Sequence, residues 1–335
     1  MKAVAYRQAG LPIEHPDSLL DIELPQPVAG PQDLLVEVRA IAVNPVDTKV
    51  RAGMQVSEPR VLGWDAVGIV RGLGADVSLF KVGDAVYYAG ALERPGSYSQ
   101  YQLVDERLAG HKPASLGDAE AAALPLTTIT AWELLFDRLQ VPEGGGEGQT
   151  LLVTGAAGGV GSMLVQLARQ LTRLTVIGSA SRPETREWVL GLGAHHVVDH
   201  SQPLDQGLAQ LGIDQVTYVA SLTHTDNHLP ALVKVLQPQG RLALIDDPAT
   251  LDIVPFKRKS VSVHWEFMFT RSMFETADMA RQHELLERVA ALVDQGVIRT
   301  TLGEHYGTIN AANLRRAHAV IESHRAQGKI VLEGF

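Results

Sequence analysis

Residues 150–161 read TLLVTGAAGGVG, and this segment gives the strongest indication of the fold. The apolar run at its start predicts a buried β-strand, and residues 160–171 carry apolar side chains at helical spacing. A second apolar run at residues 174–177 predicts the next strand. A glycine-rich turn between a strand and a helix lets the backbone approach a pyrophosphate, and the helix N-terminus offers N–H groups to the phosphates. No Gly-Lys-Ser/Thr follows, so the turn predicts a dinucleotide site and not a P-loop.

The same alternation continues on the C-terminal side of this turn. Residues 183–192 predict a helix, with Pro183 at a start position and Gly193 past the end. Further strands are predicted at residues 196–198, 216–219, 241–245 and 261–263. Because strands that alternate with helices form a parallel, doubly wound sheet, residues 123–267 are expected to form a Rossmann-type domain.

The flanking regions have a different composition and a different pattern of apolar residues. Residues 1–122 are rich in Gly, Pro and Val, and alternating runs such as residues 34–40 predict strands separated by turns. Residues 268–335 look helical and end in a strand-like run at 329–332, which we expect to return to the first region. The predicted fold class is α/β, with a β-rich catalytic domain of residues 1–122 and 268–335 around the inserted Rossmann domain.

Composition narrows the classes of function. The chain has 335 residues, of which 45% are hydrophobic and 20% charged, as in globular proteins. Its net charge of −9 disfavours nucleic-acid binding, which usually requires a basic face. No apolar run approaches the ~20 residues that span a bilayer, and the N-terminus lacks the apolar region of a signal peptide. We therefore expect a cytoplasmic protein that binds neither nucleic acid nor membrane.

The absence of cysteine limits the metal sites that the chain can build. It excludes disulfides, thiolate nucleophiles and cysteine-ligated metals, so any zinc would need His and carboxylate ligands alone. His224 and His228 have a helical spacing that places both on one face, but no HExxH frame surrounds them. We interpret the pair as polar surface and predict no metal site.

The end of the second strand indicates which dinucleotide is bound. NAD sites often carry Asp or Glu there, roughly 20 residues beyond the glycines, to bind the ribose 2′-hydroxyl. Residues 177–182 read IGSASR and contain no acid. Ser179, Ser181 and Arg182 suit a 2′-phosphate instead, because Arg is a strong anion partner. The pattern favours NADPH, and the alternative is an exposed Arg in a polar turn.

Several segments together resemble the medium-chain dehydrogenase/reductase superfamily, in particular its zinc-free quinone oxidoreductase branch. The resemblance runs over almost the whole chain and in family order. The segments that carry it are NPVDT at 44–48, GWDAVGIV at 63–70, KVGDAV at 81–86, GSYSQY at 96–101, LPLTTITAW at 124–132, AAGGVG at 156–161 and GKIVL at 328–332. Residues 265–274, WEFMFTRSMF, resemble a subgroup often called zinc-type alcohol dehydrogenase-like.

The resemblance implies a GroES-like, β-rich catalytic domain, an inserted Rossmann domain, an active site in the cleft between them, and a homodimer. Zinc-dependent members place Cys at the position of Asn44 and His at the position of Trp64, so neither ligand is present here. Their structural zinc lobe of cysteines is missing too. Many quinone reductases carry Tyr where this chain has Lys49.

These departures favour a particular reaction. Without zinc nothing acidifies an alcohol near neutral pH, whereas hydride transfer to a quinone or enone needs only positioned rings and hydrogen-bond donors for the acceptor oxygen. Asn44 is the first candidate donor, although Asn44-Pro45 would also suit a plain turn. Lys49 and Thr127 are second candidates, and Trp64 is either an apolar wall for a flat acceptor or ordinary core packing.

The glycine turn, the carboxyl ends of the strands and the resemblance together predict the cofactor contacts. By resemblance, the backbone near Ile245 and Met268 holds the nicotinamide. His200 lies where relatives often have Tyr near the adenosine, or is a histidine of a surface loop. The predicted contacts are Gly155, Ala156, Ala157, Gly158, Gly159, Val160, Gly161, Ser179, Ser181, Arg182, His200, Ser221, Ile245 and Met268.

The leading hypothesis is an NADPH-dependent reductase of a small quinone or α,β-unsaturated carbonyl compound. An alkenal or acyl-chain double-bond reductase is a close rival that the sequence does not separate from it. A rival of another class is an NADPH-binding sensor or structural protein with little turnover, since some lens crystallins resemble this branch. A zinc-dependent alcohol dehydrogenase is the third rival, and the missing Cys and His disfavour it.

Overall fold

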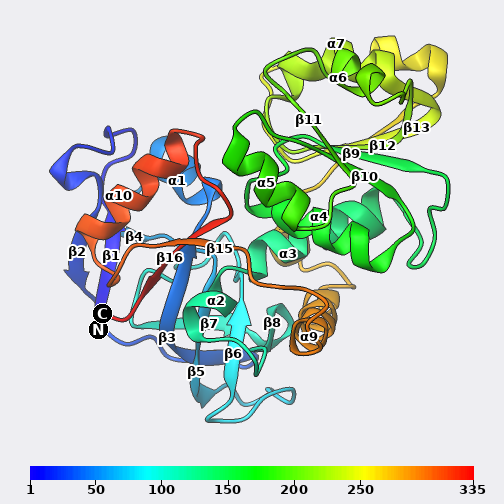
Figure 1. Cartoon of the computed structure of the whole chain (residues 1–335). Helices are drawn as coiled ribbons and strands as arrows, with labels where there is room; N and C mark the ends of the chain where they lie inside the picture. The colour runs from blue at the N-terminus through cyan, green and yellow to red at the C-terminus, as the bar shows by residue number, and fades with distance from the viewer. The chain divides into compact units, whose positions relative to one another are not determined.

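The computed structural model describes residues 1–335. The chain folds into two compact units (Figure 1). The first unit comprises Met1–Ile129 and Phe269–Phe335, and the second comprises Thr130–Met268. The domain boundaries expected from the sequence, at 122/123 and 267/268, stay predictions, because close packing does not show which segments fold independently. None of the helices combines the length and the apolar character that crossing a bilayer requires.

The second unit is built on six parallel strands in the order β11-β10-β9-β12-β13-β14. The strands are β9 (Thr150–Val153), β10 (Thr175–Ser179), β11 (His196–Val198), β12 (Val216–Ser221), β13 (Leu236–Leu244) and β14 (Ser262–Trp265). The helical elements are η3 (Glu133–Arg138, a π-helical turn), α4 (Gly159–Leu171), α5 (Pro183–Gly191), α6 (Leu204–Gln210), α7 (Thr225–Val235) and η4 (Val254–Lys259). The chain runs outward from β9 first on one side and then on the other, which confirms the doubly wound α/β fold.

The core of the second unit explains why its strands are continuously apolar. A parallel sheet is covered on both faces, so both side-chain directions of each strand are buried. All six residues of β12 are buried, as are the last three of β9. The buried cluster comprises Leu152, Ile177, Val198, Leu204, Leu208, Val216, Val219, Leu232, Val235, Leu236, Leu242, Leu244 and Phe256.

The first unit contains a seven-stranded sheet in the order β15-β16-β3-β5-β6-β8, with β7 also paired to β3, and a three-stranded sheet in the order β2-β1-β4. The strands are β1 (Lys2–Tyr6), β2 (Leu20–Glu23), β3 (Asp33–Val43), β4 (Arg60–Val61), β5 (Ala66–Leu73), β6 (Ala85–Tyr88), β7 (Tyr101–Asp105), β8 (Ala109–His111), β15 (Leu302–His305) and β16 (Lys329–Glu333). The helices are η1 (Pro16–Ser18), α1 (Pro45–Gly53), η2 (Glu106–Leu108), α2 (Asp118–Ala122), α3 (Pro125–Trp132), α8 (Thr270–Met273), α9 (Arg281–Asp294) and α10 (Ala311–Glu322).

The C-terminal strand is an internal strand of this sheet. β16 pairs antiparallel with β3, so that Ile330 lies opposite Val43 and Leu332 lies opposite Ile41. Figure 1 shows the two strands, from opposite ends of the chain, side by side. This pairing brings Lys329, at the start of β16, to the end of β3.

Close packing of β3 against β5 requires a glycine at one position. A Cβ added to Gly68 would lie 2.3 Å from the carbonyl oxygen of Glu37 and 2.5 Å from Cγ1 of Val36. The same strand has a second glycine, Gly72, where an added Cβ would meet only the side chain of Leu35, at 3.5 Å.

We predict that Gly68→Ala lowers the free energy of unfolding by about 1–3 kcal/mol, because the backbone of β3 must move to admit the methyl group. Gly72→Ala is the matched control and is expected to change it by at most about 0.5 kcal/mol. Urea denaturation of both variants measures the difference. Equal stabilities of the two variants would contradict the close approach at Gly68.

Candidate functional site

The glycine turn of the second unit leaves its backbone open to a ligand. Gly155 has a φ of 63°, a left-handed conformation that favours glycine. A Cβ on Gly161 would lie 2.5 Å from the carbonyl oxygen of Gly155, so the start of α4 packs directly on the turn. The first turn of a helix leaves N–H groups without intrahelical acceptors, which suits a phosphate. Gly158, Gly159 and Val160 are half-buried at this point, and Ala156 and Ala157 are buried beneath it.

Ser179 supports the turn from the end of β10. Its Oγ accepts a hydrogen bond from the N–H of Gly155 at 3.2 Å and lies 3.2 Å from Nδ1 of His200. Because Ser179 is buried, this hydroxyl holds protein groups in place. Ser181 and Arg182 are partly exposed, and Nε of Arg182 lies 3.3 Å from Oε1 of Glu184. The end of β10 therefore presents a guanidinium and a hydroxyl to solvent.

A second polar network lies beyond the carboxyl end of β12. Oγ of Ser221 lies 2.7 Å from Oγ1 of Thr225, which in turn donates to Oδ1 of Asp246 at 2.5 Å. The N–H of Thr225 also donates to Asp246, at 2.8 Å. Ile245 donates its N–H to the carbonyl of Ser221 at 3.3 Å and is half-buried, whereas Met268 is buried. The sequence pattern indicated Ser221 but not the carboxylate of Asp246, which holds the Thr225 hydroxyl that contacts Ser221.

In the first unit, the amide of Asn44 belongs to a buried polar network. Asn44 lies between the end of β3 and the start of α1 and is 1% exposed. Its Nδ2 donates to Oδ2 of Asp65 at 2.8 Å and lies 3.4 Å from the carbonyl of Ala42. Its Oδ1 accepts from the ammonium of Lys329. Since the ammonium can only donate and the carboxylate can only accept, the orientation of the amide is fixed.

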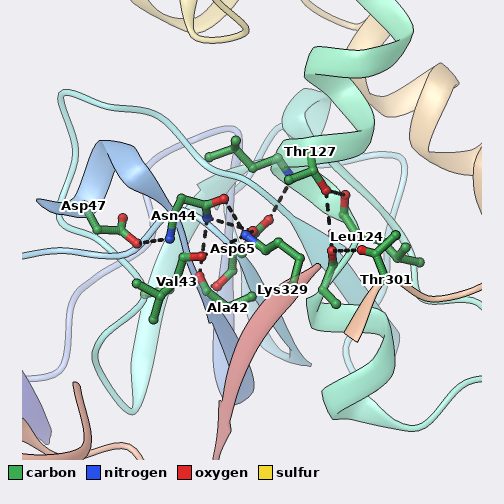
Figure 2. A network of polar contacts seen from close by, with 12 residues as sticks. Ala42, Val43, Asn44, Asp47, Asp65, Leu124, Thr127, Thr301 and Lys329 are labelled. Atoms are coloured by element: carbon green, nitrogen blue, oxygen red, sulfur yellow. Dashed lines mark hydrogen bonds and ion pairs between the residues drawn. The ribbon is translucent and has the colours of Figure 1, made fainter. Parts of the chain in front are cut away.

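The ammonium of Lys329 is the centre of this network (Figure 2). Nζ lies 2.9 Å from Oδ2 of Asp65 and 3.0 Å from the carbonyl of Val43, in addition to its contact with Asn44. The other oxygen of Asp65 accepts from the N–H of Leu126 at 2.7 Å. Burial raises the pKa of Asp65, and the ammonium of Lys329 is the strongest of the groups that oppose this rise. A buried ion pair needs such complete hydrogen bonding to offset its desolvation.

The four residues predicted to contact the acceptor have different environments. Thr127 is buried and its hydroxyl lies 3.2 Å from the carbonyl of Leu124 (Figure 2). Trp64 is also buried, and its indole N–H donates to the carbonyl of Ala91 at 3.1 Å. Only Lys49, on α1, is exposed. The amide of Asn44 and the indole N–H of Trp64 therefore have their donors engaged within the protein.

A further set of titratable groups lies beside Asn44. Oδ2 of Asp47 accepts from the N–H of Asn44 at 2.7 Å and from the hydroxyl of Tyr98 at 2.9 Å. The same hydroxyl lies 3.1 Å from Nε2 of His318 on α10. Burial raises the pKa of Asp47 to about 7, and burial lowers the pKa of His318 to about 3, with a further contribution from Arg51. No group of three or more His, Asp or Glu side chains is arranged to hold a metal ion.

Comparison with family models and relatives places these features in context. The model of an alcohol dehydrogenase GroES-like domain matches residues 30–114, and that of a zinc-binding dehydrogenase matches residues 192–332. The chain is 37% identical over 310 residues to a zinc-type alcohol dehydrogenase-like protein of Staphylococcus aureus (strain MSSA476), covering 92% of each chain. It is 28% identical over 326 residues to the quinone oxidoreductase of Lama guanicoe, covering 93% of this chain and 92% of that one.

Solved structures show the same fold over the full length. A protein from Rhizobium etli CFN 42, which carries the name of a zinc-dependent alcohol dehydrogenase, is 55% identical with a TM-score of 0.96, covering 100% of this chain and 98% of that one. The mycobacterial protein Rv1454c, solved in complex with NADPH, is 26% identical with a TM-score of 0.84, covering 99% of each chain.

We predict that Lys329→Met destabilises the protein by about 3–5 kcal/mol, because it leaves the carboxylate of Asp65 buried without its cation. The double variant Lys329→Met, Asp65→Asn removes both charges and is expected to recover part of this loss. Thermal or urea unfolding measures both variants. A loss below about 1 kcal/mol in the single variant would show that the buried ion pair does not organise this site.

The pKa of Asp47 predicts a pH-dependent stability. Its value of about 7 in the folded protein lies above the usual value of about 3.9, so its contribution to stability is present at low pH and is lost as the pH rises through 7. His318 acts oppositely, since its lowered pKa of about 3 makes acid destabilising below about pH 6.5. The stability of Asp47→Asn relative to that of the wild type should therefore increase by about 1.4 kcal/mol per pH unit as the pH rises from about 5 to 7. A difference that does not change with pH would contradict the assignment.

Proposed function

The chain belongs to the medium-chain dehydrogenase/reductase family, and we propose that within it this oxidoreductase uses NADPH to reduce small quinones or α,β-unsaturated carbonyl compounds without zinc. The observation that carries the proposal is the glycine turn of the second unit, combined with residues 177–182 at the end of β10, which include Arg182 and no acidic residue. The quinone oxidoreductase of Lama guanicoe and the NADPH complex of Rv1454c support the acceptor class and the cofactor, respectively.

The residues of the second unit fit a phosphorylated dinucleotide. The backbone of the turn at Gly158 and the N-terminus of α4 suit the pyrophosphate. A carboxylate at the end of β10 would repel a 2′-phosphate, whereas the guanidinium of Arg182 attracts one. Ser179 and Ser221 are buried and act through the protein: Ser179 supports the glycine turn, and Ser221 supports the carboxyl end of β12. Bound NADPH supplies the hydride, and the protein supplies its position.

Zinc does not fit the corresponding position of the first unit. Family members with zinc carry Cys where this chain has Asn44, and His where it has Trp64. The indole N–H of Trp64 can only donate, and Oδ1 of Asn44 faces the ammonium of Lys329, whose positive charge would repel a metal ion there. The chain thus places a fixed ammonium, and not a metal ion, beside Asn44. The zinc in the names of several relatives describes those proteins.

This arrangement changes the roles that we propose for the four acceptor-site residues. Asn44 and Thr127 act as positioning residues, because their polar atoms hold the end of β3 and the start of α3. Trp64 contributes a buried apolar wall, packed edge-on against Phe269 with ring centroids 6.1 Å apart. Lys49 is exposed and is the candidate to donate a hydrogen bond to the acceptor oxygen.

We also propose a homodimer. β14 is the edge strand of the six-stranded sheet, and an unpaired edge can bind another strand. Trp265 and Phe267, at and just beyond its end, are 54% and 46% exposed and add apolar surface to this edge.

The experiment that tests the function is NADPH oxidation, followed by absorbance, with quinones, enones and saturated ketones as acceptors. We expect turnover of quinones or enones that persists in EDTA and is faster with NADPH than with NADH. Arg182→Ala should raise the KM for NADPH by about tenfold or more and leave the KM for NADH unchanged, because it removes a charge-assisted hydrogen bond to the 2′-phosphate.

Arg173→Ala is the matched control, since Arg173 is exposed in the same unit and pairs only with the exposed Glu147. NADPH binding without turnover of any acceptor would favour the sensor or structural protein. Loss of activity in EDTA would favour a zinc enzyme and contradict the proposal.

A further inference from the structure

A chain of buried hydrogen bonds runs from the loop of Asn44 to α10 in the first unit. The N–H of Asn44 donates to Oδ2 of Asp47 at 2.7 Å (Figure 2). The hydroxyl of Tyr98 lies 2.9 Å from the same oxygen and 3.1 Å from Nε2 of His318. Asp47, Tyr98 and His318 are all 0% exposed. The proposed reduction assigns no role to these three side chains.

Tyr98 carries a single hydroxyl hydrogen, which limits how the chain can be protonated. Two hydrogen bonds meet at its oxygen, so Tyr98 donates one of them and must accept the other. When Asp47 is ionised, Tyr98 donates to it, and Nε2 of His318 must carry the imidazole hydrogen. When Oδ2 of Asp47 is protonated, both bonds reverse. Asp47 then donates to Tyr98, Tyr98 donates to Nε2, and the imidazole hydrogen lies on Nδ1.

The other carboxyl oxygen of Asp47 is a poor position for the proton. Oδ1 of Asp47 and Nδ1 of His318 are both buried without a hydrogen-bond partner. A proton on Oδ1 would leave a carboxylic O–H unbonded, whereas a proton on Oδ2 leaves only the weaker imidazole N–H unbonded. Because a buried donor without an acceptor is costly, the proton is expected on Oδ2, where it faces Tyr98.

Asp47 is the group of this chain that titrates near neutral pH. Burial raises its pKa to about 7. Hydrogen bonds from Asn44 and Tyr98 and the nearby ammonium of Lys329 oppose this rise in pKa, whereas the carboxylate of Asp65 adds to it. Asp65 and Lys329 form an ion pair without net charge. The charge of Asp47 therefore decides whether this buried region is neutral or carries one negative charge.

Tyr98 and His318 stay neutral in the same pH range. Burial, followed by the carboxylate of Asp47, raises the pKa of Tyr98 well above its usual value of about 10. Burial, followed by the guanidinium of Arg51, lowers the pKa of His318 to about 3. Arg51 itself pairs with Glu322 at 2.5 Å. The chain therefore exchanges a proton without a stable tyrosinate or imidazolium.

We propose that Asp47, Tyr98 and His318 form a proton relay between α10 and the loop of Asn44, through which pH sets the charge of this loop. As the pH rises, one proton leaves Nδ1 of His318, the hydrogen of Tyr98 moves to Nε2, and that of Asp47 moves to Tyr98. The proton is released at α10, and the negative charge appears at Asp47. Each transfer breaks one O–H or N–H bond and forms another, and solvent takes the released proton.

The relay has a consequence for the reduction, and this part of the inference rests on the proposed function. Hydride transfer places negative charge on the acceptor oxygen. The proposed acceptor site includes Asn44, so a carboxylate at Asp47 repels that charge, whereas a neutral Asp47 does not. We expect kcat for quinone reduction to fall several-fold as the pH rises from about 6 to 8, and this fall to be absent from Asp47→Asn.

Nitrogen-15 NMR of the full chain, labelled at its histidines, tests the relay without any turnover. The signals of His318 are those that His318→Gln removes. In the wild type we expect a neutral imidazole whose hydrogen moves from Nδ1 to Nε2 as the pH rises through about 7. Tyr98→Phe removes the hydroxyl that links the two ends, so the tautomer should no longer change with pH. Asp47→Asn should have the same effect, and it tests the link even where Tyr98→Phe does not fold.

Tyr87→Phe is the matched control. Tyr87 is also 0% exposed, and its hydroxyl donates to the carbonyl of Leu286 at 2.5 Å. The variant loses a buried hydrogen bond of the same kind outside the relay. It should therefore keep the change of tautomer at His318.

The outcomes separate the relay from the proposed function. A tautomer of His318 that does not change with pH, an imidazole that becomes charged near pH 7, or a change that survives in Asp47→Asn would overturn the relay and leave the reduction intact. A change present in the wild type and Tyr87→Phe, and absent from Asp47→Asn, supports the relay whether or not a quinone is reduced. The same pH dependence of kcat in the wild type and Asp47→Asn would overturn its effect on the reduction.

Discussion

The buried ammonium of Lys329 is the interaction on which the first unit depends. It joins the start of the last strand to the end of β3, across 285 residues of chain between Lys329 and Asn44. An ammonium removed from water is costly unless every N–H is bonded, and here Asp65, Asn44 and Val43 accept all three. The requirement fixes the register of β16 on β3, the amide of Asn44 and, through Asp65, the start of α3.

This constraint also explains how the site differs from that of a zinc enzyme. A metal ion would need lone pairs at the two positions held by Asn44 and Trp64, and the chain uses both for internal hydrogen bonds. Hydride transfer to an electron-poor acceptor does not require a Lewis acid, because hydrogen-bond donors aimed at the acceptor oxygen can stabilise the charge that develops on it. The positive charge beside Asn44 is the ammonium of Lys329, which the carboxylate of Asp65 neutralises.

How much the sequence predicts depends on whether the signal is local. The glycine turn and its strand and helix lie within residues 150–171, so the doubly wound sheet followed from pattern alone and is confirmed. The pairing of Lys329 with Asp65 was not predicted, because nothing local in the sequence indicates a partner more than 250 residues away. For the same reason the sequence indicated Asn44 as a candidate hydrogen-bond donor, but not that its amide is engaged within the protein.

Under the proposed function, this chain moves a hydride from NADPH to an electron-poor carbonyl compound without a metal. A single-turnover experiment tests it most directly, with protein whose zinc content has been shown to be negligible by elemental analysis, mixed with one equivalent of NADPH and excess quinone or enone. We predict loss of the nicotinamide absorbance at the same rate with and without added zinc, and a slower rate with NADPH deuterated at the transferred position. Absorbance lost only after zinc is added, or not at all, would contradict the account.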